Sequence, residues 1–192
     1  MRVQAAIDAI LLRLERDLSR NLFYHSVAHT RDVLARTVEL AELEDITDPE
    51  DLDLLRTAAA YHDSGFLINN RDHERLGCKL ARAELPAYDY TEEQIERICG
   101  MIRATKVPQK PRNHLEQIIC DADLDYLGRD DFYPIGRLLF RELKAFRLLE
   151  TEAEWNALQI KFLKAHSYWT ETNKKVRAGR KEAYLEALES RE

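Results

Sequence analysis

The sequence contains little glycine and proline, six and five residues among 192, and no alternating apolar and polar run longer than a few positions. Because such alternation is typical of half-buried strands, its absence disfavours a β-rich fold. Alanine, leucine, glutamate, arginine and lysine dominate, and these residues have high helix propensity. Apolar residues make up 45% of the chain, enough to form a core. We therefore predict an all-α fold.

Cysteine is also scarce. The three cysteines, Cys78, Cys99 and Cys120, are scattered and lack C-x-x-C spacing, which argues against a disulfide framework and favours buried thiols in a reducing compartment. The N-terminal stretch MRVQAAIDAILLRLERDL is interrupted by arginine and aspartate, unlike a signal peptide or a membrane span. We expect a soluble, cytoplasmic protein with no membrane partner.

The chain has no excess of positive charge. Its net charge of −6 argues against general nucleic-acid binding, which needs basic residues to displace counterions from phosphates. A small anionic substrate held by a local cation is still compatible with this balance. We find no glycine-rich phosphate loop, no base-reading motif, no internal repeat and no low-complexity tract.

Helical periodicity and capping residues define the first half of the chain. Apolar residues recur at helical spacing over 3–18, and Ser26 can cap a second helix that reaches about Leu43. Asp48 and Pro49 suit the start of a third helix, which Gly65 can end. This pattern places residues 62 and 63 in the last turn of that helix, beside an apolar run.

The second half follows the same pattern. Further helices are predicted over 73–85 and, after a capping box of Thr91 with Gln94, over 92–104, followed by a loop over 107–113. A helix over 113–128 comes next. From residue 131 to the C-terminus the pattern stays helical, with breaks near Pro134, Thr151 and Thr170. We predict a single helical-bundle domain over 1–192.

Three fragments place ionisable groups against apolar sequence: His25 with His29, His62 with Asp63, and the run D121-A-D123-L-D125. On a helix, Asp123 and Asp125 border the apolar face on opposite sides, and Asp121 lies further round. Each fragment alone also fits an ordinary role, respectively a hydrogen-bonded core histidine, an exposed helix end and a solvated face. A carboxylate buried without a partner costs roughly several kcal/mol, so a nearby cation is its natural partner.

Taken together, two imidazoles and two carboxylates form a nitrogen and oxygen ligand set. Four such ligands leave positions open on a six-coordinate ion, and they suit Mn, Fe, Co, Ni or Mg better than a structural zinc. An open position accepts water or a substrate oxygen, which indicates hydrolysis.

The order H…HD…D in an all-helical chain resembles the HD superfamily of metal-dependent phosphohydrolases. The matching residues are His29, His62, Asp63 and Asp123, and the resemblance covers about residues 20–130. Asp123 is preferred over its neighbours because the family aspartate usually sits in an Ala-Asp-x-Leu context, as in A-D-L-D here. The resemblance implies an HD-type helical domain on which the helices over 131–192 pack, with a divalent metal bound by these four residues.

The stretch YHSVAHTRDV also resembles the first motif of cyclic-nucleotide phosphodiesterases. That resemblance implies a proton-donating role for His25 and a metal-ligand role for His29. Asp63 or a neighbouring carboxylate would orient the attacking water. Lys106, just after a helix, is our candidate for holding the substrate phosphate, although a solvated loop lysine fits it too.

Three further residues are candidates for the surroundings of the metal or substrate: His73, Asp121 and His166. The expected partner is a small phosphorylated substrate, a nucleotide above all, cleaved as a mono- or diester. Two alternatives stay open. One is a catalytically silent module that senses a nucleotide. The other is a di-iron oxygenase on the same fold, which would need His73 and His114 as extra ligands.

Overall fold

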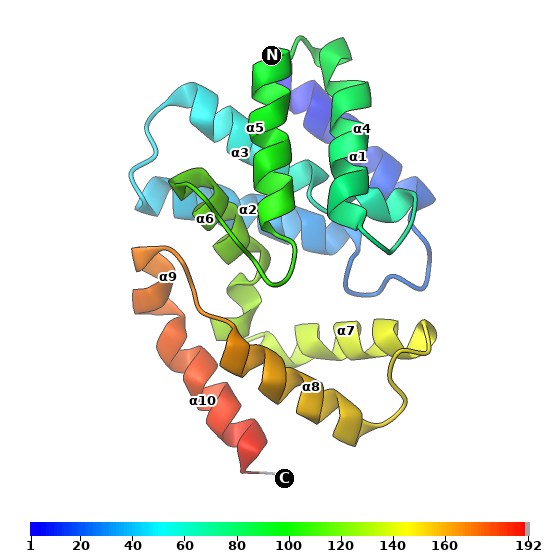
Figure 1. Ribbon diagram of the computed structural model, residues 1–192, viewed down its shortest axis with the longest axis vertical. Helices are drawn as coiled ribbons and strands as arrows, with labels where there is room; N and C mark the ends of the chain where they lie inside the picture. The colour runs from blue at the N-terminus through cyan, green and yellow to red at the C-terminus, as the bar shows by residue number, and fades with distance from the viewer. Residues whose placement is uncertain (191–192) are drawn as a thin grey trace.

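The computed structural model describes residues 1–190, and within that range it contains helices and no strand, so the all-α prediction is confirmed. Figure 1 shows their arrangement. The elements, with short 3₁₀ helices marked η, are α1 (Val3–Asp17), α2 (Val27–Leu43), α3 (Pro49–Tyr61), η1 (Ser64–Leu67), α4 (His73–Glu84), η2 (Leu85–Tyr88), α5 (Glu92–Ala104), α6 (His114–Asp123), η3 (Asp125–Gly128), α7 (Phe132–Ala145), α8 (Glu152–Ala165), α9 (Glu171–Val176) and α10 (Ala178–Glu189).

Local capping signals located most helix starts correctly. Ser26, Asp48 and Thr91 each accept a backbone N–H of the first turn of the helix that follows, and Thr91 forms the expected capping box with Gln94. Two helices end earlier than the sequence suggested. α3 stops at Tyr61, so residues 62 and 63 lie just past its end, and α6 stops at residue 123 before η3 begins.

The predicted break near Pro134 was wrong. α7 begins at Phe132 and runs through Pro134, because proline in the first helical turn removes only an N–H that would have no partner within the helix. The breaks near Thr151 and Thr170 are confirmed, since these residues cap α8 and α9. The sequence analysis did not predict the further break at Arg177, between α9 and α10.

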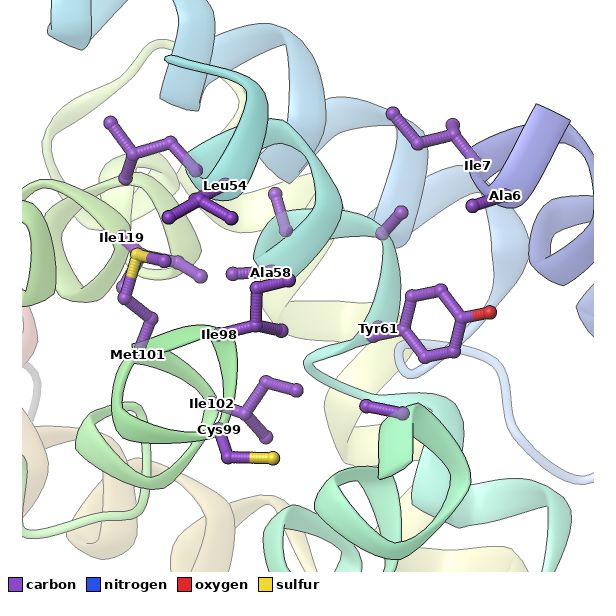
Figure 2. Packing of buried hydrophobic residues seen from close by; sticks show 14 of the residues in the cluster. Ala6, Ile7, Leu54, Ala58, Tyr61, Ile98, Cys99, Met101, Ile102 and Ile119 are labelled. Atoms are coloured by element: carbon purple, nitrogen blue, oxygen red, sulfur yellow. The ribbon is translucent and has the colours of Figure 1, made fainter. Parts of the chain in front are cut away.

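The buried apolar residues form two clusters. The larger one lies among α1 to α6, with residues such as Leu54, Ala58, Ile98 and Ile102 fully or almost fully buried between α3 and α5 (Figure 2). The smaller one joins η3 to α7, α8 and α10 and includes Phe132 and Leu163. Figure 1 shows α7, α8 and α10 together on one side of the first six helices. The end of α6 and η3 therefore connect the two clusters.

Asp121 helps to fasten the C-terminal segment to α6. The sequence placed this residue away from the apolar face, but its side chain is fully buried. Its carboxylate accepts hydrogen bonds from the backbone N–H groups of Trp169 and Thr170, both at 2.9 Å, and from the Thr170 hydroxyl at 2.7 Å. Burial raises the pKa of Asp121 to about 6, although these hydrogen bonds lower it. Asp121 thus binds the 169–170 segment.

No helix within residues 1–190 combines the length and apolar character that a bilayer-spanning segment requires.

Candidate metal centre and adjoining cavity

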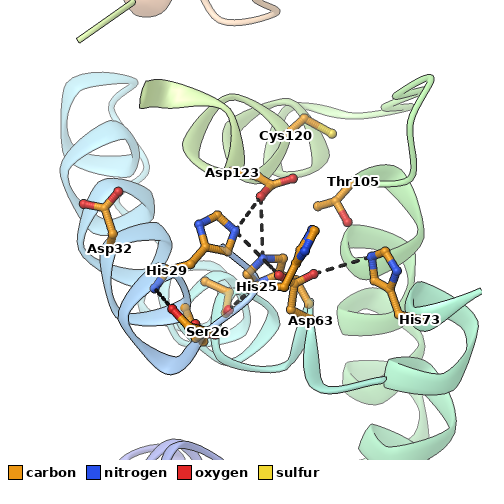
Figure 3. A network of polar contacts seen from close by, with 12 residues as sticks. His25, Ser26, His29, Asp32, Asp63, His73, Thr105, Cys120 and Asp123 are labelled. Carbon is orange, nitrogen blue, oxygen red and sulfur yellow. Dashed lines mark hydrogen bonds and ion pairs between the residues drawn. The ribbon is translucent and has the colours of Figure 1, made fainter. Parts of the chain in front are cut away.

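Four side chains from three parts of the chain converge at the junction of α2, α3 and α6, and Figure 3 shows three of them, His29, Asp63 and Asp123. The Nε2 atom of His29 lies 3.2 Å from Oδ1 of Asp123 and 3.5 Å from Oδ2 of Asp63. The Nε2 atom of His62 lies 3.2 Å from the same Asp63 oxygen and 3.6 Å from Oδ1 of Asp123. The structure therefore brings together all four residues of the H…HD…D pattern.

This group suits a divalent cation. One ligand atom from each of His29, His62 and Asp123 lies within 4.8 Å of the others, and Asp63 adds a carboxylate oxygen between the two histidines. Nε2 of His62 and Oδ2 of Asp63 are buried and lie 3.2 Å apart, but within residues 1–190 neither atom makes a contact with hydrogen-bond geometry. Buried polar atoms are rarely left without a hydrogen bond, and a cation bound by both atoms would satisfy them.

A hydrogen bond outside the group orients His62. Its Nδ1 donates to the carbonyl oxygen of Ala59 at 2.8 Å, so Nε2 is the ring nitrogen that faces the carboxylates. A backbone bond of this kind fixes the imidazole tautomer of metal-binding histidines. The early end of α3 makes it possible, because His62 caps the helix and turns back toward its last turn.

Neighbouring opposite charges shift the pKa values of Asp63, Asp123 and His62. Burial would raise the pKa of Asp63, but His62, with His25 and His29, holds it well below its usual value. Burial would also raise the pKa of Asp123, but its contacts with His29 and His62 lower that pKa to about 2. Desolvation lowers the pKa of His62, yet the two carboxylates raise it well above normal. The two carboxylates are therefore ionised, and their charges are balanced by the neighbouring imidazole of His62.

His25 lies beside this group and is held by Glu142 of α7, a residue that the sequence analysis did not identify. Its Nδ1 is in close contact with Oε1 of Glu142, while Oε2 accepts the backbone N–H groups of Tyr24 at 2.8 Å and His25 at 3.1 Å. Desolvation lowers the pKa of His25, but the Glu142 hydrogen bond and the charges of Asp63 and Asp123 raise it above its usual value.

His73 reaches the group from α4. Its Nε2 lies 3.5 Å from Oδ1 of Asp63, and its ring stacks on Phe66 at 4.1 Å between centroids. The other side of this aromatic cluster is His25, stacked on Phe66 at 4.3 Å. Gly65 makes the approach possible, because a Cβ there would overlap the backbone of His73. His73 therefore lies beside Asp63.

A cavity of about 390 Å³ opens from the centre and is lined by His25, Asp63, His73 and Asp123 at that end. Lys106 lies on its wall, with 56% of the side chain exposed and Nζ 2.9 Å from Oδ1 of Asp72. Asp72 and Glu74 line the same end, and the part of the wall that comes from η3, α7 and α8 is mostly apolar.

His166 does not line this cavity. It is buried beside Phe162 and Tyr168 and borders a separate hollow of about 110 Å³. Neither ring nitrogen of His166 has a hydrogen-bond partner among residues 1–190. His114 is also distant from the centre along its helix: it begins α6, whereas Asp123 ends it, and its Nε2 lies 3.4 Å from Glu44.

We expect the substitution His166→Phe to reduce the fall in the free energy of unfolding that wild-type protein shows between pH 7 and pH 4. Burial and the nearby Lys181 lower the pKa of His166 from 6.5 to about 4. Between these values the unfolded chain binds more protons, so wild-type stability falls as pH falls, by up to about 3 kcal/mol. Denaturant unfolding of both proteins from pH 7 to pH 4 measures the difference. Parallel pH profiles for the two proteins would contradict this assignment.

Glu142 and the apolar wall were missed because nothing local marks them. Glu142 sits in the sequence LFRELKAF and resembles any helical glutamate, yet it is only 3% exposed. The apolar residues of α7 and α8 are spaced as in any amphipathic helix. Only their packing against the first six helices gives them a place beside the centre.

Comparison with known proteins agrees with this geometry. A family model described as HD domain matches residues 27–125, just over half of the 192 residues. A predicted HD superfamily hydrolase from an uncultured Thermotogales bacterium is 21% identical, with a TM-score of 0.63, over 97% of this chain and 89% of its own. A comparison with curated proteins gave no match.

Two further crystal structures are similar over the whole chain. Bacillus subtilis YpgQ, solved in complex with ADP, is 20% identical, with a TM-score of 0.65 and 97% of its chain covered. A Lactobacillus plantarum protein is 18% identical, with a TM-score of 0.68 and 98% covered. At these identities the structures establish the shared fold. Together with the family match, which includes His29, His62, Asp63 and Asp123, they show that the chain belongs to the HD-domain family.

Proposed function

We propose that this chain is a metal-dependent phosphohydrolase that acts in the cytoplasm on a nucleotide or another small phosphate mono- or diester. The observation that carries the proposal is the convergence of the His29, His62, Asp63 and Asp123 side chains, whose facing nitrogen and oxygen atoms lie 3.2–3.6 Å apart. A hydrolase also needs room for its substrate, and the cavity beside Asp63 and Asp123 supplies it.

The four residues would hold the ion, with Mn, Fe, Co, Ni and Mg as the candidate metals. A divalent ion at this place supplies Lewis acidity and acidifies a water molecule to give a nucleophile near neutral pH. Asp63 has a second role in the proposal, because its Oδ1 faces the cavity side and His73, where it can orient the attacking water.

His25 is the proposed general acid. Glu142 occupies Nδ1, so Nε2 is the nitrogen that can give a proton to the departing alkoxide. The raised pKa of His25 keeps the ring protonated over a wider range around neutral pH. Lys106 and His73 line the same cavity and are the proposed contacts for the substrate's phosphoryl oxygens.

A nucleotide is favoured within this class because Bacillus subtilis YpgQ, which shares the fold, was solved in complex with ADP. The silent sensing module is less well supported, since binding alone does not require the His25–Glu142 pair beside the centre. The di-iron alternative is weaker still. It needs His114 as a ligand, and that residue contacts Glu44 at the opposite end of α6.

Hydrolysis of a panel of nucleotides and simple phosphate esters tests the proposal, with Mn, Fe, Co, Ni or Mg added separately to metal-stripped protein. We expect phosphate release with at least one metal and its complete loss when a chelator is added. Readdition of that metal should restore the rate. Release that is indifferent to chelator, or absent with every metal and substrate, would overturn the proposed function.

A further inference from the structure

The cavity beside the metal centre has two chemically different ends. Four carboxylates, those of Asp63, Asp72, Glu74 and Asp123, lie along the end formed by the first six helices. The other end is an apolar arm, built by η3, α7 and α8. The residues of the apolar arm are Leu127, Phe132, Leu139, Trp155, Leu158, Phe162 and Leu163. A substrate that binds both ends must carry a polar, reacting group and an apolar body.

One polar side chain interrupts the apolar arm. Gln159 of α8 lines the cavity, is half-buried, and makes no side-chain hydrogen bond with any residue in the range 1–190. Its Oε1 lies near Gly136 of α7, where the glycine leaves the space between the two helices open. An amide offers both donors and an acceptor, so Gln159 can recognise a ligand edge that carries both.

The charges around the cavity limit what the polar end can take. Among the described residues that line it, Lys106 is the only lysine or arginine, and it already pairs with Asp72. The phosphoryl group must therefore rely mainly on the metal centre for charge neutralisation. Binding free energy from the body of the substrate would come from the apolar arm, where burial contributes in proportion to apolar area.

We propose that the apolar arm binds a planar aromatic ring of the substrate, while Gln159 recognises hydrogen-bonding groups on the edge of that ring. This inference rests on the proposed function, because it assigns the phosphate ester to the metal centre. Two classes of phosphate ester carry such a ring. A heteroaromatic base, as in a nucleotide, uses both the arm and Gln159, whereas a plain aryl group uses the arm alone.

Matched substrates test the arm. We expect kcat/KM for nucleoside 5′-monophosphates to exceed that for ribose 5-phosphate, which has the same kind of alkyl leaving group, by at least about tenfold, which corresponds to about 1.4 kcal/mol. Gln159→Leu should lower kcat/KM about tenfold for the nucleotides, by the loss of about one hydrogen bond, and leave 1-naphthyl phosphate unchanged. Asn156→Leu, on the same helix but outside the cavity lining, is the control and should change neither.

A binding measurement separates this inference from the proposed function. Trp155 lines the arm, so 1-naphthyl phosphate should quench its fluorescence saturably in a Trp169→Phe background, with or without turnover. Quenching without hydrolysis of any ester would overturn the proposed function and support the arm. Three results would each overturn the inference. They are the absence of saturable quenching, equal kcat/KM for ring-bearing and ring-free esters, and an equal loss of kcat/KM for both ring types in Gln159→Leu.

Discussion

Replacement of Asp63 by asparagine is expected to lower kcat by about 10²–10³-fold, because several kcal/mol of transition-state stabilisation depend on the bound ion and each 1.36 kcal/mol is tenfold. Asp63 is the residue whose oxygen lies 3.5 and 3.2 Å from the Nε2 atoms of His29 and His62. Asparagine keeps the shape of the side chain but removes the charge that pairs with the cation.

A second measurement in the same variant does not depend on turnover. A metal that binds only the folded state stabilises it by about 2.7 kcal/mol at one hundred times its dissociation constant. Wild-type protein should therefore melt at a higher temperature when the activating metal is added, and Asp63→Asn should show a much smaller shift. Asp45→Asn, at an exposed position in the turn after α2, is the control and should match wild type in both assays. Full metal stabilisation in Asp63→Asn would remove this residue from the ligand set.

Loss of the imidazole in His25→Gln should reduce kcat about 10²–10⁴-fold for an alkyl phosphate ester, the usual contribution of a positioned general acid. The metal-dependent rise in melting temperature should persist, since His25 lies outside the four converging residues. The deficit should shrink for 4-nitrophenyl phosphate, whose leaving group departs without a proton. An equal deficit for both esters would show that His25 does not donate the proton.

Glu142→Gln tests the partner of His25 separately. Its hydrogen bond and charge help to raise the pKa of His25, so the variant should lower that pKa. A general acid must be protonated, and the fall in kcat with rising pH should therefore move to lower pH than in wild type. Loss of a supporting partner typically costs about 10–100-fold. Glu42→Gln, exposed on α2, serves as the control and should keep the wild-type profile. An unshifted profile in Glu142→Gln would assign Glu142 a purely structural role.

The sequence was sufficient for the features that depend on local chemistry. Helix starts at Ser26, Asp48 and Thr91 follow from one side chain and the N–H groups a few residues further on. The four residues of the H…HD…D pattern were identified because such ionisable groups are unusual beside apolar sequence, and because their order resembles one family. The structure brings the four side chains within 3.2–3.6 Å of one another, and their role as metal ligands stays a prediction.

Features that depend on distant segments could not be predicted. Glu142 contacts His25 across a separation of 117 residues, and no local pattern encodes that meeting. Asp121 was placed off the apolar face because helical geometry alone says nothing about the 169–170 segment that covers it. Both cases concern the packing of the C-terminal helices on the first six.

The candidate metal centre and the apolar arm of the cavity come from two different stretches of the chain. The four converging side chains lie within the family-matched span 27–125, whereas the apolar arm comes from residues 127–163. Exchange of the α7–α8 hairpin for one of different shape would therefore alter which compounds fit while the ion-binding half keeps its own core. Such chimaeras offer a route to new substrate preferences, provided that the carboxylate facing His25 is carried into the replacement.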